Sequence, residues 1–215
     1  MTIHDVVDLT LLATTFLTLF VIMDPLGTVP VFLALTPRAT AAQRRRAALH
    51  ATLVAFSVIL VFTLFGQYIL GFLGISLPAL QLSGGLLLLL VALELLMGWG
   101  SRPEPTGEIA EGKGPLNVAL VPLGTPLLAG PGAIVAAMLA VQESDGTAAP
   151  RVAIGIALVA VHLCIYLALR FANTVHRVLG EGGTTLVTRL AGLLLAAIAV
   201  QLMADAVFAF IDAEL

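Results

Sequence analysis

The chain has very few charged residues and a single cysteine. Only 11% of its 215 residues are Asp, Glu, Lys or Arg, and none of these lies between Ala47 and Leu93. Because soluble domains typically carry about 25% charged residues, this scarcity excludes an ordinary soluble domain. As the only cysteine, Cys164 excludes an intramolecular disulfide and a cysteine-cluster metal site. We therefore expect no metal and no cofactor.

Hydrophobic residues make up 60% of the chain, and the mean hydropathy is +1.08. This composition predicts an all-α integral membrane protein, because a helix satisfies its own backbone hydrogen bonds in lipid. The uncharged run from Ala47 to Leu93 is long enough for two spans of about 20 residues each. Hydropathy and turn residues together predict six transmembrane helices, at residues 9–36, 47–71, 78–98, 115–142, 152–170 and 189–211.

The Lys and Arg residues are distributed very unevenly over this six-helix arrangement. All except Arg151 fall on one side, and the positive-inside rule places that side in the cytoplasm. The loops 37–46, 99–114 and 171–188 are then cytoplasmic, and both termini are outside. An excess of Arg over Lys is typical of a GC-rich bacterial genome, so we expect a multi-pass protein of the bacterial inner membrane. Arg44, Arg45 and Arg46 fit orientation and anionic lipid contact, not nucleic-acid binding.

Two hydrophobic segments are interrupted by similar strings. Pro25-Leu26-Gly27-Thr28 recurs 97 residues later, beginning at Pro122, and a similar pair occurs 107 residues apart, around Gly85 and Gly192. The matches predict two three-helix repeats, at residues 1–98 and 115–215, joined by a cytoplasmic linker at 99–114. Since each repeat has an odd number of spans, the second inserts inverted relative to the first.

Proline within a hydrophobic segment predicts that helices 1 and 4 are broken near the membrane midplane. We expect Asp24 and Pro25 to be the N-cap and first residue of a second half-helix, and Gly130 and Pro131 to play the same roles in helix 4. In an inverted repeat both half-helix N-termini approach the midplane, where their free amides favour a substrate carboxylate. Carbonyls at the ends of the first halves would accept from an ammonium group or a cation. The pair of breaks therefore suits a zwitterion.

The strings Asp24–Pro30 and Pro122–Gly132 resemble those of the MarC family of multi-pass membrane proteins, and the resemblance extends to Ser83-Gly84-Gly85 and Gly192. It covers nearly the whole chain. The resemblance implies six spans and a place among transporters of small neutral amino acids, with alanine and glycine as the associated substrates. The expected substrate-binding residues are those at the two breaks: Asp24, Pro25, Gly27, Thr28, Gly124, Thr125, Gly130 and Gly132.

Several of these residues have a structural role as an alternative to a binding role. Asp24 is either a cap that holds the break open, or a cap that also binds a substrate ammonium group, a proton or sodium. Thr28 and Thr125 either contact the ligand or donate to their own helix carbonyls. Glu94 and Asp205 are further candidates for ion coupling. His162 either relays protons or donates to a helix carbonyl.

The sequence favours a secondary transporter that moves a small polar substrate by alternating access, coupled to a proton or sodium gradient. The alternatives are a channel-like pore, a small-molecule exporter of another substrate, a scaffold subunit and an intramembrane enzyme. An enzyme is the least expected, because Cys164 and His162 point to different faces of a helix and no catalytic motif occurs. The sequence leaves open whether the chain forms a homo-oligomer.

Overall fold

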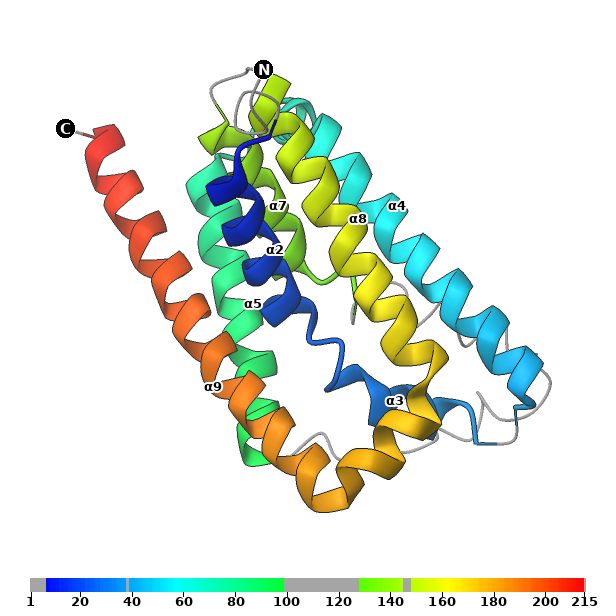
Figure 1. Cartoon of the computed structure of the whole chain (residues 1–215). Helices are drawn as coiled ribbons and strands as arrows, with labels where there is room; N and C mark the ends of the chain where they lie inside the picture. The colour runs from blue at the N-terminus through cyan, green and yellow to red at the C-terminus, as the bar shows by residue number, and fades with distance from the viewer. Residues whose placement is uncertain (1–6, 38, 99–127, 145–147, 215) are drawn as a thin grey trace.

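A computed structural model describes residues 7–37, 39–98, 128–144 and 148–214 of the chain. In these residues the regular secondary structure is entirely α-helical (Figure 1). The helices are, in order, α2 (Leu9–Met23), α3 (Thr28–Leu35), α4 (Ala41–Leu73), α5 (Leu77–Met97), α7 (Pro131–Glu143), α8 (Ala148–Arg170) and α9 (Ala172–Glu214).

Four stretches of helix are long and apolar enough to cross a membrane, namely α4, α5, α8 and the Gly182–Asp212 part of α9. A fifth crossing is possible if α2 and α3, which meet at an angle of 43°, form one bent span. The apolar part of α7, Pro131–Gln142, is shorter. The beginning of α2 and the end of α9 lie on the same side of the bundle (Figure 1). The prediction of an all-α integral membrane protein is therefore confirmed.

Polar side chains and glycines set the ends of these helices. Thr40 and Gln43 form a reciprocal capping box at the start of α4, which begins six residues earlier than we expected from hydropathy. The Ser76 hydroxyl accepts from the Ala79 N–H at the start of α5. Gly74 and Gly98 end α4 and α5 in the left-handed conformation, with φ of 67° and 70°. The short connection between α4 and α5 follows from these caps.

The segment predicted as a loop at 171–188 is largely helical, because α9 (Ala172–Glu214) consists of two helical stretches joined at Gly180. Its cytoplasmic location stays a prediction. The direction of the chain changes inside this helix, at Gly180, which has φ 63° and ψ −178°. A residue with a side chain rarely adopts this positive φ, whereas glycine adopts it at little cost. One glycine thus replaces the long loop that the distribution of charges suggested. The predicted linker at 99–114 and the first part of predicted helix 4, up to residue 127, lie outside the described residues.

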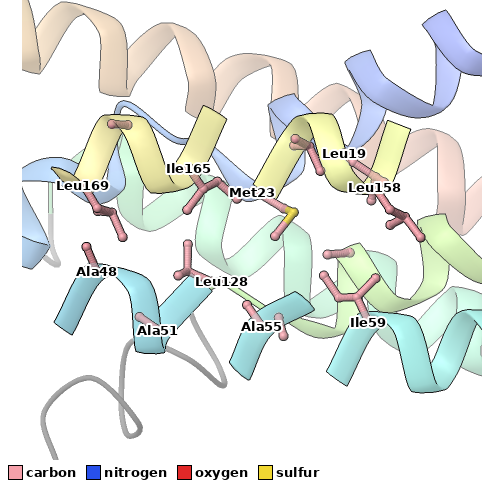
Figure 2. Close-up of a cluster of buried hydrophobic side chains, with 14 of the residues drawn as sticks. Leu19, Met23, Ala48, Ala51, Ala55, Ile59, Leu128, Leu158, Ile165 and Leu169 are labelled. Atoms are coloured by element: carbon pink, nitrogen blue, oxygen red, sulfur yellow. The ribbon is translucent and has the colours of Figure 1, made fainter. Parts of the chain in front are cut away.

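The main hydrophobic core fills the space between α2, α4, α7 and α8. On α4 it is built from alanines one turn apart, including Ala48, Ala51 and Ala55, whose side chains are fully buried. The small side chains let the larger residues of the facing helices, such as Ile165 and Leu169, pack close to the α4 backbone (Figure 2). Leu128, just before α7, lies fully buried in the same cluster.

A second cluster joins α5 to α9, and its closest contacts are reciprocal. A Cβ at Gly85 of α5 would lie 3.0 Å from the carbonyl oxygen of Ala199 in α9. A Cβ at Gly192 of α9 would lie 3.1 Å from the carbonyl oxygen of Ala92 in α5. Gly192 and Ala199 each lie 107 residues after the α5 residue that makes the equivalent contact. In each helix, therefore, a glycine contacts the partner helix at the carbonyl of an alanine in the equivalent position.

Candidate functional site

The first break separates α2 from α3 at Asp24. This residue closes α2 in the left-handed conformation, with φ 39° and ψ 73°, and its N–H donates to the Phe20 carbonyl at 3.1 Å. Asp24 is the only residue other than glycine with positive φ among those described. Aspartate and asparagine are the side-chain-bearing residues that tolerate this region best. The break is therefore fixed by a specific residue and is not a gradual bend.

The Asp24 carboxylate holds the turn that leads into α3. Its Oδ1 accepts from the Gly27 N–H at 3.0 Å, while the Asp24 carbonyl accepts from the Thr28 N–H at 3.1 Å. The expectation that Asp24 is the N-cap of this half-helix is wrong, because the N-cap is Gly27 and no side chain makes a capping hydrogen bond there, while Asp24 is the C-cap of α2. The expectation that Pro25 is the first residue of the half-helix is wrong, because α3 begins at Thr28 with Gly27 as N-cap. The left-handed backbone at Asp24 requires one further turn before the chain can enter α3.

Gly27 and Thr28 complete this turn. A Cβ at Gly27 would overlap the Asp24 carboxylate, so only glycine leaves room for the cap. The Thr28 hydroxyl is buried and lies 3.0 Å from the Pro25 carbonyl and 3.1 Å from the Asp24 carbonyl. Its proton is therefore directed to its own backbone, which is the structural alternative that the sequence left open.

The second predicted break falls at the start of α7, and the part of predicted helix 4 before Leu128 lies outside the described residues. Gly130 is the N-cap in extended conformation and Pro131 the first residue, as predicted. The Gly130 carbonyl accepts from the Ala133 N–H at 3.0 Å and from the Ile134 N–H at 3.2 Å. Within the described residues, the buried N–H of Gly132 has no hydrogen-bond partner. Because glycine provides no capping side chain, this helix start keeps a free donor.

Both breaks border the same hydrophobic core. Met23 and Val29, on either side of Asp24, belong to one buried cluster with Leu128, Ala129 and Ala133 around the second break. Figure 2 shows Met23 and Leu128 within this cluster. Two other predicted site residues, Gly124 and Thr125, lie outside the described residues.

The remaining candidates lie away from the breaks. The exposed side chain of Glu94 lies in the last turn of α5. Asp205, on α9, accepts from the Gln201 side-chain amide at 2.7 Å. His162 Nδ1 lies 2.7 Å from the Leu158 carbonyl, which fits the structural alternative for this histidine. Among the described residues, no group of three or more His, Cys, Asp or Glu side chains could hold a metal ion.

Sequence reasoning missed a cavity of about 540 Å³, lined by both polar and apolar side chains, that lies between α2, α5, α7 and α9. Its polar lining comes from Thr14, Thr15, Thr18, Gln81, Gln201 and Asp205. The available signal was the spacing of Thr14, Thr15 and Thr18, because residues three and four apart share one face of a helix.

Comparison with known proteins gives a consistent result over nearly the whole chain. The sequence model of a family described as MarC family integral membrane protein matches residues 9–211. A UPF0056 membrane protein of Methanocaldococcus jannaschii is 38% identical over 200 residues, which cover 93% of this chain and 97% of the relative. A UPF0056 membrane protein of Aquifex aeolicus is 36% identical over 88% of this chain and 89% of its own length.

A third relative, the UPF0056 membrane protein YhcE of Escherichia coli, is 32% identical over 86% of each chain. No solved structure matches the chain.

Proposed function

The chain belongs to the MarC family of integral membrane proteins, and from this premise we propose that it is a secondary transporter of small neutral amino acids, such as alanine or glycine, or of a similar small polar metabolite. The observation that carries the proposal is that the break at Asp24 and the helix start at Gly130 border one buried core. Interrupted helices with polar backbone are tolerated in a membrane where they line a site for a polar substrate.

We propose six spans arranged as two inverted three-helix repeats, with the second repeat containing α7, α8 and α9. The reciprocal contacts of Gly85 and Gly192 support this arrangement, since equivalent positions related by a two-fold axis must contact each other in both directions. The packing of α7 against α5 at Gly84 and Leu88 is matched by packing of α3 against α9. Repeats of this kind allow alternating access by exchange of conformation between the two halves.

The two breaks offer complementary groups to a zwitterion. The free N–H of Gly132, at the positive end of the α7 dipole, suits a substrate carboxylate. The Asp24 carboxylate uses Oδ1 to accept from Gly27, and we propose that Oδ2 accepts from the substrate ammonium group. A proton or sodium gradient would drive accumulation, with Asp24, Glu94 and Asp205 as the candidate groups for coupling.

We place the protein in the bacterial cytoplasmic membrane with both termini outside, on the positive-inside rule. The position of the start of α2 and the end of α9 on one side supports an even number of crossings. We propose no enzymatic activity and no cofactor. The proposed ligands are a small substrate and H⁺ or Na⁺, within a lipid bilayer and without nucleic acid.

Counterflow of labelled alanine and glycine in proteoliposomes tests this proposal. Asp24→Asn removes the charge but keeps a capping oxygen, and asparagine also tolerates positive φ, so this variant should fold. We expect its half-saturation concentration to rise at least about 10-fold, since a hydrogen bond between charged groups is lost. The control is Asp212→Asn, which removes an exposed carboxylate near the end of α9.

The outcomes separate the competing functions. Saturable counterflow that is weakened in Asp24→Asn and unchanged in Asp212→Asn supports the transporter. Flux without saturation or counterflow would indicate a pore. If Asp24→Asn keeps counterflow but loses gradient-driven accumulation, Asp24 couples the ion and does not bind the substrate. No flux of any amino acid by the folded protein would refute the substrate class.

A further inference from the structure

The cavity between α2, α5, α7 and α9 lies away from the two breaks. Its α2 residues, from Thr14 to Leu19, precede Asp24 by five or more residues, or about 7 Å or more along the helix. Its α7 residues follow the start of that helix by at least five residues. The cavity therefore lies between the breaks and the side of the bundle where α2 begins. It is a separate place for a ligand.

Two hydroxyl groups in this cavity have no partner. Thr15 is only 5% exposed, and its Oγ1 has no hydrogen-bond partner within the described residues. The Thr18 hydroxyl also lacks a partner there. By contrast, the buried Thr52 and the half-buried Thr63 donate to a carbonyl one turn earlier, at 2.9 Å and 2.7 Å. A buried hydroxyl without a partner costs free energy, so its persistence points to a ligand that supplies the missing contact.

The other polar groups of the cavity add acceptors and one negative charge. Gln81 is 7% exposed, and its side-chain amide has no partner within the part of the chain that the structure describes. Asp205 receives one hydrogen bond, from Gln201 to Oδ1 at 2.7 Å, and its Oδ2 receives none from the described residues. Of the described lining residues, Asp205 alone carries a formal charge. The cavity therefore offers several oxygen atoms and a net negative charge.

We propose that this cavity binds a small monovalent cation through Asp205, Thr15, Thr18 and Gln81. Oxygen atoms from a carboxylate, hydroxyls and an amide are the ligands that a hard cation prefers, and they also accept from an ammonium group. The cation is either Na⁺ or the ammonium group of an amine on its way to the breaks. The role of this cation in transport rests on the proposed function, whereas the binding of the cation depends only on the residues that line the cavity.

Binding of labelled Na⁺ and of labelled methylammonium to the purified full-length protein in detergent tests this inference, and neither measurement requires transport. The test variants are Thr15→Val, which keeps the shape of the side chain but removes the hydroxyl, and Asp205→Asn. The matched controls are Thr52→Val, at a buried threonine whose hydroxyl donates to its own helix, and Asp212→Asn, at an exposed carboxylate outside the cavity lining.

We expect saturable binding of one of the two cations, weakened about 10-fold or more by Asp205→Asn and at least several-fold by Thr15→Val. The two controls should change affinity less than two-fold. Competition between Na⁺ and methylammonium identifies which cation the site prefers. Absence of saturable binding of both cations, or equal binding by Asp205→Asn and the native chain, would overturn the inference. Amino-acid counterflow with no cation binding would overturn it and leave the proposed function intact.

Discussion

Replacing Gly85 or Gly192 by alanine should weaken the contact between α5 and α9 to a similar degree. At Gly85 a Cβ would lie 2.8 Å from Met203 Cγ and 3.0 Å from the Ala199 carbonyl oxygen. At Gly192 it would lie 3.0 Å from Leu95 Cβ. Backbone oxygens and Cβ atoms cannot rotate away, so the two helices must separate.

The expected magnitude follows from two opposing terms. Alanine favours a helix over glycine by about 1 kcal/mol, and overpacking of a tight contact costs about 1–3 kcal/mol. The net change in the free energy of unfolding should then be a loss of up to about 2 kcal/mol at each site. Gly155 of α8 provides the control, because a Cβ there meets no atom within 4 Å. Gly155→Ala should leave stability unchanged or raise it by up to about 1 kcal/mol.

Thermal unfolding of the detergent-purified variants provides the assay, followed by exposure of the single cysteine, Cys164, to a thiol-reactive fluorophore. We expect a lower midpoint for Gly85→Ala and Gly192→Ala than for Gly155→Ala. Equal midpoints for all three variants would show that α5 and α9 are not tightly packed. A loss at only one of the two paired glycines would refute the reciprocal contact, and with it the main structural support for an inverted repeat.

Two further predictions concern the first break and its surroundings. Gly27→Ala should displace the Asp24 carboxylate and reduce amino-acid counterflow at least as much as Asp24→Asn. Size-exclusion chromatography should show that this variant still elutes as a folded species. Counterflow equal to that of the native chain would contradict the hydrogen bond from the Gly27 N–H to Asp24. Arg44→Ala should lower the free energy of unfolding by about 1–2 kcal/mol, because Arg44 donates to the Thr36 carbonyl beyond α3 at 2.8 Å. The control is Arg45→Ala, at an exposed arginine, which should change the free energy of unfolding by less than about 0.5 kcal/mol.

Local chemistry explains why the first break could be predicted. Proline cannot donate a backbone hydrogen bond, and aspartate, which stands directly before Pro25, is a residue that commonly accepts hydrogen bonds at helix ends. These constraints act within a few residues, so they are visible in the sequence. The residue that starts the half-helix was not predictable in the same way, because it depends on the left-handed backbone at Asp24. Few aspartates adopt the left-handed conformation, and whether one does depends on the surrounding packing.

The loop expected at 171–188 shows the limit of charge and hydropathy. Arg177 and Arg189 flank a polar, glycine-rich stretch, which is typical of a loop. The structure continues the helix on both sides of Gly180 and bends only there. Helix boundaries depend on which glycine adopts positive φ, and the sequence cannot rank Gly180, Gly182 and Gly183 when packing decides among them.

The sequence by itself determined that the chain is helical, belongs in a membrane and is interrupted at Asp24 and Gly130, because composition and proline act through the solvent and the local backbone. Only the tertiary structure decided that Thr15, Gln81 and Asp205 line one cavity, since they come from three helices far apart in sequence. It also decided that Gly85 and Gly192 receive each other's helix. Contacts between distant segments depend on how whole helices pack, and no local pattern specifies that packing.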